Sequence, residues 1–147
     1  MINCITRPIV FLVLCLACLL TVGCRDSGPQ LGTVSGTITL EGEPLPNAKV
    51  LFQPGPGGSP SEGRTDSNGK YELQYGIDKP GALVGEHVVR ITTYQLERET
   101  ADGPLILTKE SVPAKYNEQS ELTREVKPGH NELNFELEPG PLPSPPE

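Results

Sequence analysis

The sequence contains no tryptophan and only two histidines, and all four of its cysteines lie within the first 24 residues. The sequence has no H-E-x-x-H motif and no cysteine after Cys24, so the usual spacings of zinc ligands are excluded. The G-x-S-x-G pattern of a hydrolase nucleophile elbow is also missing. We therefore expect no enzyme activity, no cofactor and no metal, and we interpret His87 and His130 as surface or satisfied side chains.

No apolar run is long enough for a membrane-spanning helix. The longest, residues 9–22, has 14 residues, whereas a spanning helix needs about 20. It follows a single basic residue, Arg7, and it ends at Gly23 and Cys24. This arrangement predicts a signal peptide over residues 1–23.

Acidic residues outnumber basic ones after this leader. Because Arg7 is the only charged residue in the leader, the rest of the chain has 11 basic and 19 acidic groups and a net charge of −8. Such a surplus opposes binding to nucleic acid or to anionic lipid through a basic patch. The acids are spread along the chain, which indicates ordinary solvated surface.

The end of the leader resembles the lipobox of bacterial lipoproteins, which reads Leu, a small residue, Gly or Ala, and then Cys. Val22, Gly23 and Cys24 match this pattern, and Thr21 stands in place of the usual Leu. The resemblance implies that Cys24 carries a diacylglycerol thioether and an N-acyl chain, and three acyl chains hold a protein at a membrane where one does not. Arg25, in place of an inner-membrane retention Asp, favours the outer membrane. The alternative is plain secretion by an ordinary signal peptidase.

Two segments are predicted to lie outside the fold. Residues 24–32 are polar and form a tether, and residues 139–147 have five prolines in nine positions, which favours polyproline II or disorder. Between them the apolar residues alternate, as is typical of strands with one buried face. We expect such strands at 34–40, 71–75 and 133–137, and short apolar runs predict further strands at 48–52, 88–92 and 122–126. About seven short strands separated by Gly and Pro predict a single antiparallel β-sandwich over residues 33–138.

Residues 94–120 fit this alternation poorly. They form a longer connection than compact domains normally contain, and they combine the charged ERETADG with the apolar PLILT. We expect an edge strand at 105–108 and a helical turn at 95–101. Tyr94 and Tyr116 flank the segment, and they are our candidates for contact with a ligand. Their alternative role is packing over an open end of the sandwich.

The stretch from Asp66 to Tyr71 looks like part of a calcium loop. Counted from Asp66, however, Lys70 falls at the fifth position, where such loops need an oxygen ligand, and the glycine comes two places early. A turn accounts for the same residues, because Asp66 can cap it and because Asn68 and Gly69 tolerate positive φ. We predict a hairpin turn without a metal.

Taken in order, VSGTITLEGEPLPNAKVLF, GRTDSNGKYEL and GEHVVRIT resemble the carboxypeptidase regulatory-like domain, a transthyretin-like sandwich of the prealbumin and immunoglobulin type. VPAKYN and VKPGHNELNFEL further resemble small bacterial lipoproteins built on this domain. The resemblance implies an accessory or binding module without catalytic residues. Our first hypothesis is a non-catalytic, lipid-anchored β-sandwich that contacts an envelope protein. The alternative is a module that binds a small ligand or a polysaccharide through Tyr94 and Tyr116.

Overall fold

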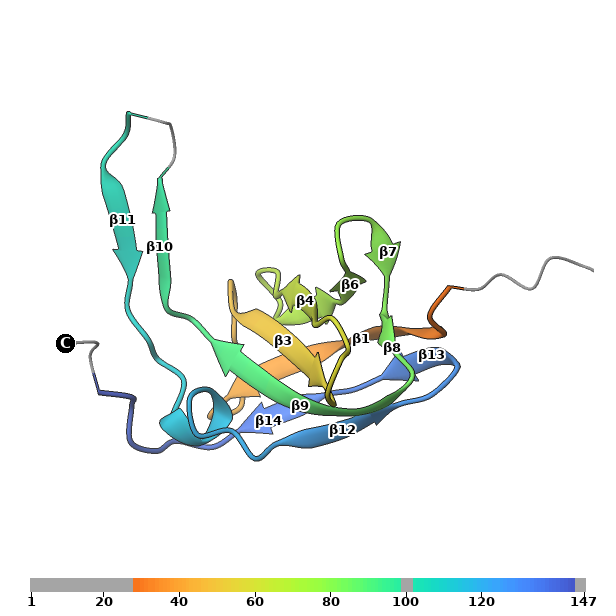
Figure 1. The fold of residues 1–147 in the computed structure, drawn as a ribbon. Helices are drawn as coiled ribbons and strands as arrows, with labels where there is room; N and C mark the ends of the chain where they lie inside the picture. Colours follow the sequence, from red (N-terminus) through yellow and green to blue (C-terminus); the bar gives the residue numbers. More distant parts are fainter. Residues whose placement is uncertain (1–27, 99–101, 145–147) are drawn as a thin grey trace, which may run out of the picture.

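The computed structural model describes residues 28–98 and 102–144, so the expected signal peptide and Cys24 lie outside the described residues. Regular structure is almost entirely strand (Figure 1). The strands are β1 (Leu31–Leu40), β2 (Glu43–Pro44), β3 (Lys49–Pro54), β4 (Ser61–Arg64), β5 (Lys70–Glu72), β6 (Gln74–Tyr75), β7 (Lys79–Pro80), β8 (Ala82–Leu83), β9 (Gly85–Thr92), β10 (Gln95–Arg98), β11 (Leu105–Thr108), β12 (Thr123–Val126), β13 (Gly129–Glu132) and β14 (Phe135–Leu137). A 3-10 turn, η2 (Ala114–Tyr116), precedes β12. Within these ranges, no helix has the length and apolar character to cross a membrane.

Two sheets form the predicted all-β sandwich. In the first, β1 is central, with β13 and β14 along one edge and β8, β5 and β2 along the other. The second sheet is antiparallel and runs in the order β12-β9-β3-β4-β6-β7. A separate pair, β10 and β11, extends away from the sandwich (Figure 1). The number of strands exceeds the expected seven because several are two-residue pieces interrupted by turns.

The pairing of β1 departs from the predicted antiparallel arrangement. Gly32 pairs in parallel with Gly129, and Ile38 pairs in parallel with Phe135. Both offsets are 97 residues (129 − 32 and 135 − 38), so the last two strands follow one edge of β1 without a slip. The first strand of the domain is therefore the direct neighbour of its last two strands in this sheet. β1 begins at Leu31, two residues before the predicted start of the domain.

The core consists of the inward side chains of both sheets, and it confirms the predicted alternation. Val34 and Ile38 of β1 are buried, as are Val50 and Phe52 of β3. The rings of Phe52 and Phe135 meet edge to face, with centroids 6.2 Å apart, and so join the two sheets. The other buried apolar residues of this core are Leu45, Ala48, Tyr71, Leu73, Ala82, Val89, Ile91, Val112, Val126 and Leu137.

Gly36 allows a close approach between β1 and the connection from β13 to β14. A Cβ at this position would lie 1.9 Å from the Leu133 carbonyl oxygen. That oxygen accepts a hydrogen bond from the Tyr71 hydroxyl at 2.7 Å. Burial raises the pKa of the Tyr71 phenol well above its ordinary value. Gly36, Tyr71 and Leu133 thus form one packed contact across the first sheet.

The turn from Asp66 to Lys70 is the predicted hairpin turn, closed by a hydrogen bond from the Asp66 backbone N–H to the Lys70 carbonyl at 2.8 Å. The Asp66 carboxylate accepts hydrogen bonds from the backbone N–H groups of Asn68, at 2.8 Å, and Lys70, at 2.9 Å. These bonds, the one from Lys70 first, hold the pKa of Asp66 below its usual range. Gly69 has a φ of +73°. After the turn, Gln74 and Tyr75 of β6 pair antiparallel with Glu62 and Ser61 of β4, which confirms the hairpin. The intervening β5 pairs with β1 in the first sheet.

Candidate functional site

The segment between β9 and η2 forms a projecting arm, which we define as residues 94–109. Its strands pair antiparallel, with Gln95 opposite Thr108 and Arg98 opposite Leu105. Figure 1 shows the arm extending from the end of β9, at the opposite end of the sandwich from the start of β1. The edge strand predicted at 105–108 is confirmed. The helical turn predicted at 95–101 is wrong, because Gln95–Arg98 is a strand that gains its backbone partners from β11.

The arm gathers exposed apolar side chains. Leu96, Leu105 and Leu107 are 55%, 54% and 52% exposed, and Ile106 is 44% exposed. Leu96 lies directly opposite Leu107, and Leu105 shares the face of Leu107 because side chains alternate along a strand. Three leucines therefore share one face of the ribbon with Arg98, which lies opposite Leu105. We call the three leucines the leucine face. Because exposed apolar patches are a common feature of interaction sites, this face is a candidate site.

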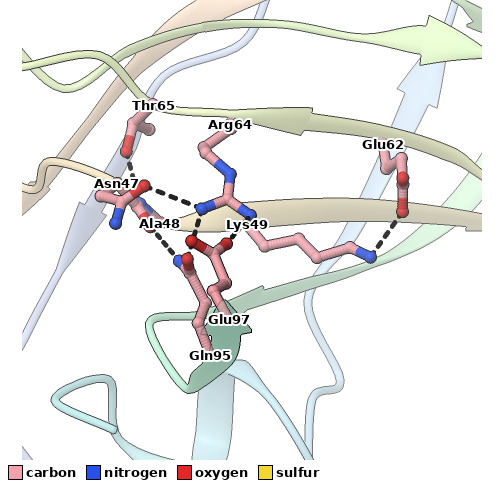
Figure 2. A network of polar contacts seen from close by, with 8 residues as sticks. All are labelled: Asn47, Ala48, Lys49, Glu62, Arg64, Thr65, Gln95 and Glu97. Carbon is pink, nitrogen blue, oxygen red and sulfur yellow. Dashed lines mark hydrogen bonds and ion pairs between the residues drawn. The ribbon is translucent and has the colours of Figure 1, made fainter. Parts of the chain in front are cut away.

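A polar network holds the base of the arm against the sandwich (Figure 2). The Arg64 guanidinium donates to Asn47 Oδ1, at 2.9 Å, and to Gln95 Oε1. It also forms an ion pair with Glu97 at 3.0 Å. Gln95 Nε2 in turn donates to the Asn47 carbonyl at 2.6 Å. Since Gln95 and Glu97 share the ribbon face opposite the leucines, this network turns the leucine face away from β4.

We expect Arg64→Met to loosen the arm without unfolding the sandwich. The three contacts of Arg64 lie at the base of the arm, so their loss should cost about 1 kcal/mol locally and speed hydrogen exchange of the β10 amides roughly fivefold. Lys49→Met is the matched control. The exposed Lys49–Glu62 ion pair, 2.6 Å long, joins β3 to β4, the strand that ends at Arg64, but it does not contact the arm. Equal exchange rates in the two variants would contradict this role of Arg64.

Glu110 fastens the base of the arm on the side where the chain returns from β11. Its carboxylate accepts hydrogen bonds from Thr92 Oγ1 at 2.5 Å, from Thr93 N at 3.0 Å and Oγ1 at 2.8 Å, and from Val112 N at 2.8 Å. Burial acts to raise the pKa of this carboxyl, but the hydrogen bonds from Thr92, Thr93 and Val112 outweigh burial and leave the pKa lowered. The chain thus leaves the sandwich after β9 and returns to it at one fastened point.

Acid should release this fastening. A carboxyl whose pKa is lowered by folding stabilises the folded state above its unfolded pKa, here 4.5, and the stabilisation is lost as the pH falls through the lower, folded pKa. We expect protection of the Thr93 and Val112 amides, corrected for intrinsic exchange, to fall below about pH 4.5. Glu110→Gln should lower this protection at pH 7 and remove its dependence on acid. Protection that does not change with pH in the wild type would contradict the assignment.

A groove of about 670 Å³ lies between the arm and the C-terminal tail. Its apolar walls come from both, because Leu107 belongs to β11 and Leu142 to the tail. Tyr94 also lines the groove and is 45% exposed, so its ring is accessible to a ligand. The remaining lining residues are Lys109, Glu110, Glu118, Pro143 and Ser144.

Tyr116, the second predicted contact, does not line this groove. Its ring packs against the core, and its hydroxyl accepts a hydrogen bond from the Glu138 backbone N–H at 3.1 Å. The Lys115 ammonium lies 4.9 Å from the centre of the ring. The structure therefore separates the two tyrosines: Tyr94 is open to a ligand, whereas Tyr116 has the packing role that we gave as the alternative.

The tail contacts the domain, although we predicted that it lies outside the fold. The Ala114 backbone N–H donates to the Pro141 carbonyl at 2.9 Å, and Lys115 pairs with Glu138 at 3.3 Å. Residues 139–144 contain no strand or helix, as their prolines predict. The docked tail supplies one wall of the groove.

The two histidines differ in their surroundings. His130 is exposed, and its Nδ1 lies 3.4 Å from Thr33 Oγ1. His87 is buried, and its Nε2 donates to the Leu83 carbonyl at 2.7 Å. In the part of the chain that the structure describes, His87 Nδ1 and Ser61 Oγ have no hydrogen-bond partner. Our interpretation of His87 as satisfied is therefore wrong for one of its two nitrogens.

Sequence comparison yields no family: no model of a known protein family and no curated protein matches the chain. Solved structures do resemble it, among them the following two. A 9R-lipoxygenase from Cyanothece has 17% identity and a TM-score of 0.42, over 76% of this chain and 17% of that one. A DUF3823 family protein from Parabacteroides merdae has 18% identity and a TM-score of 0.40, over 75% of this chain and 47% of that one. The chain spans less than half of either protein, and neither likeness carries an argument about function.

Proposed function

We propose that this protein is a non-catalytic module of the cell envelope, held at the outer membrane by lipid on Cys24, that binds a protein partner through the arm. The observation that carries the proposal is the leucine face, Leu96, Leu105 and Leu107, each more than half exposed. As part of this proposal, we assign the sandwich to the carboxypeptidase regulatory-like domains, within a small lipoprotein.

The position of the arm supports binding at a distance from the anchor. A lipid on Cys24 would tether the start of β1, and the arm leaves the sandwich at the other end, after Thr92 (Figure 1). A partner on the leucine face would thus meet the protein away from its membrane attachment. The contacts of Arg64 and Glu110 keep the arm in this position. Both charged side chains are thus used to hold the structure together, which fits a binding module better than an enzyme that uses them as acid or base.

A second candidate is a module that binds a small ligand or a carbohydrate. The observation in its favour is the exposed ring of Tyr94 in the groove between arm and tail. Flat exposed rings stack on sugar faces as well as on apolar ligands. The two surfaces share Leu107, but Leu96 and Leu105 belong only to the leucine face and Tyr94 only to the groove, so substitutions at these three positions can separate the candidates.

Affinity capture from envelope extract tests the proposal. The wild-type chain is expected to retain a specific protein that Leu96→Asp combined with Leu105→Asp loses. Ile77→Asp is the matched control, because Ile77 is a fully exposed apolar residue that is not part of the arm. Loss of a bound polysaccharide in Tyr94→Ala, with no protein lost in the leucine variant, would favour the second candidate. Identical proteins retained by all variants would overturn the arm as the binding surface.

A further inference from the structure

Asn68 and Gly69 form the one Asn-Gly pair in the sequence. Asparagine is among the labile residues of proteins. Its side chain is attacked most readily when glycine follows, because glycine has no Cβ to obstruct the approach of its own backbone nitrogen. Asn68 is exposed in the turn between β4 and β5, so the water that the reaction consumes has free access to it.

The reaction at such a pair is deamidation through a succinimide. The Gly69 nitrogen loses its proton to solvent and attacks Asn68 Cγ, so that the N–Cγ bond forms and Nδ2 takes up a proton and leaves as ammonia. Water then opens the five-membered ring. Cleavage of the new N–Cγ bond gives aspartate, whereas cleavage of the bond from the Asn68 carbonyl carbon to the nitrogen gives isoaspartate. One water is taken up and one ammonia is released, without oxidation or reduction.

The fold engages the attacking nitrogen. The Gly69 N–H donates to the Asp66 carbonyl at 3.0 Å, so the proton that must be lost is held in a hydrogen bond, and Gly69 itself is buried. This bond joins the fourth residue of the turn to the first, and Asn68, the third, does not have a positive φ. Aspartate in the first position and glycine in the fourth are typical of a type I turn, in which ψ of the third residue is about 0°.

The type I conformation also points the nitrogen away from its target. Ring closure needs Gly69 N on the same side of the Asn68 Cα–C bond as Cβ, whereas in this turn it eclipses the Asn68 nitrogen, a third of a turn away. Rotation about the Cα–C bond would carry Gly69 with it. That rotation would break the bond to Asp66 and also the bond from the Ile38 N–H to the Gly69 carbonyl, which is 2.8 Å long.

The Asp66 carboxylate restrains the same rotation. It accepts hydrogen bonds from the backbone N–H groups of Asn68, at 2.8 Å, and of Lys70, at 2.9 Å. These two groups belong to the peptide units directly before and after the one that must rotate. A side chain that caps its own turn in this way holds the backbone in the turn conformation.

We propose that Asn68 is a site of spontaneous deamidation that the fold keeps unreacted, with Asp66 as the positioning residue that holds the turn closed. The reaction then proceeds only from molecules in which the turn has opened, and their fraction sets its rate. It is irreversible, because isoaspartate adds a methylene group to the backbone within the hydrogen-bonded turn. The inference depends neither on the arm nor on the lipid anchor.

Mass spectrometry of the full-length protein, incubated at mildly alkaline pH, tests the inference. Trypsin cuts after Arg64 and Lys70 and releases residues 65–70, so the gain in mass of this fragment measures deamidation of Asn68. A free peptide of the same sequence is the reference without the fold. We expect Asn68 to react at least roughly tenfold more slowly in the folded protein, because the turn is open in only a minor fraction of molecules.

Substitutions test the role of Asp66. Asp66→Ala should speed deamidation in the folded protein roughly fivefold, because two hydrogen bonds to the carboxylate are lost while the backbone bonds of the turn remain. Asp66→Ser should give an intermediate rate, since a hydroxyl caps the same turn more weakly. Asp78→Ala is the matched control: it removes an equally charged, exposed side chain from the connection between β6 and β7 and should leave the rate unchanged.

Each part of the proposal can fail separately. Equal rates in the folded protein and the free peptide would overturn protection by the fold, and an unreactive peptide would overturn the site itself. A rate that is unchanged by Asp66→Ala, or raised as much by Asp78→Ala, would overturn the role of Asp66. Should a denaturant melt show that Asp66→Ala is unfolded, the comparison of Asp66→Ser with Asp78→Ala decides the same question.

Discussion

Gly69→Val is expected to destabilise the domain by more than about 2 kcal/mol, because two costs combine. Gly69 has a φ of +73°, which a β-branched residue adopts only with strain. A Cβ there would also lie 2.5 Å from the Ile38 carbonyl oxygen. That contact cannot relax freely, because the Ile38 backbone N–H donates to the Gly69 carbonyl at 2.8 Å and ties the turn to β1. Denaturant melts of the two proteins give the difference in the free energy of unfolding.

Gly76→Val separates the two costs. Gly76 has a φ of +67°, yet no atom lies within 4 Å of a Cβ built there. Valine at this position should cost only the backbone strain, about 1 kcal/mol. Asp66→Ala should also cost less than Gly69→Val, since it removes acceptors from an exposed turn whose backbone bonds remain. Equal free energies for Gly69→Val and Gly76→Val would mean that the clash with Ile38 is relieved by a shift of the turn.

Cys24→Ser is expected to abolish incorporation of fatty acid and to move the protein from the detergent fraction to the soluble one. The thiol is the acceptor for the diacylglycerol group that the Val22-Gly23-Cys24 pattern implies, and a serine hydroxyl does not replace it. Without acyl chains, the acidic chain has no basic patch to hold it at a membrane. Labelling with a fatty-acid analogue and phase partitioning measure the two effects.

Cys18→Ser is the control for this experiment, because Cys18 lies within the apolar run of the leader and outside the lipobox pattern. It should leave labelling and partitioning unchanged. A wild-type protein that is soluble, and that begins at a residue other than Cys24, would show instead that an ordinary signal peptidase releases it.

Much of the sandwich can be predicted from the sequence, because the alternation of apolar and polar residues indicates which side chains are buried. Val34 and Ile38, for example, are buried, and the residues next to each of them in the sequence are polar. The strands with which a given strand pairs cannot be predicted in the same way. Nothing local to residues 31–40 indicates that β1 pairs in parallel with residues 129–137, since the pairing depends on contacts across the whole chain. At the turn after Asp66 the residues predict the hairpin, but they do not indicate that β5, which follows the turn, pairs with β1.

One of the two strands of the arm could be predicted from the sequence. The apolar residues 105–108 indicate a strand, and the poor alternation around them indicates something outside the core. The helical turn at 95–101 is wrong because the propensity of Glu and Arg for helix is weak beside pairing with β11. Arg64 and Glu110, which fasten the arm, are 46 residues apart in sequence (110 − 64) and resemble ordinary surface charges. Only their partners, Gln95 and Thr93 among them, distinguish them.

The parallel pairing of β1 with β13 and β14 sets the order in which the molecule can fold. β1 is the first strand to be synthesised, and one of its edges stays bare until residues 129–137 are available, nearly 100 residues later. Contacts of such long sequence separation slow folding, towards the milliseconds-to-seconds range of β-sandwiches. This edge of β1 therefore remains open until residues 129–137 have been synthesised, and a truncation before Phe135 would leave the end of β1 without the partner that closes its sheet.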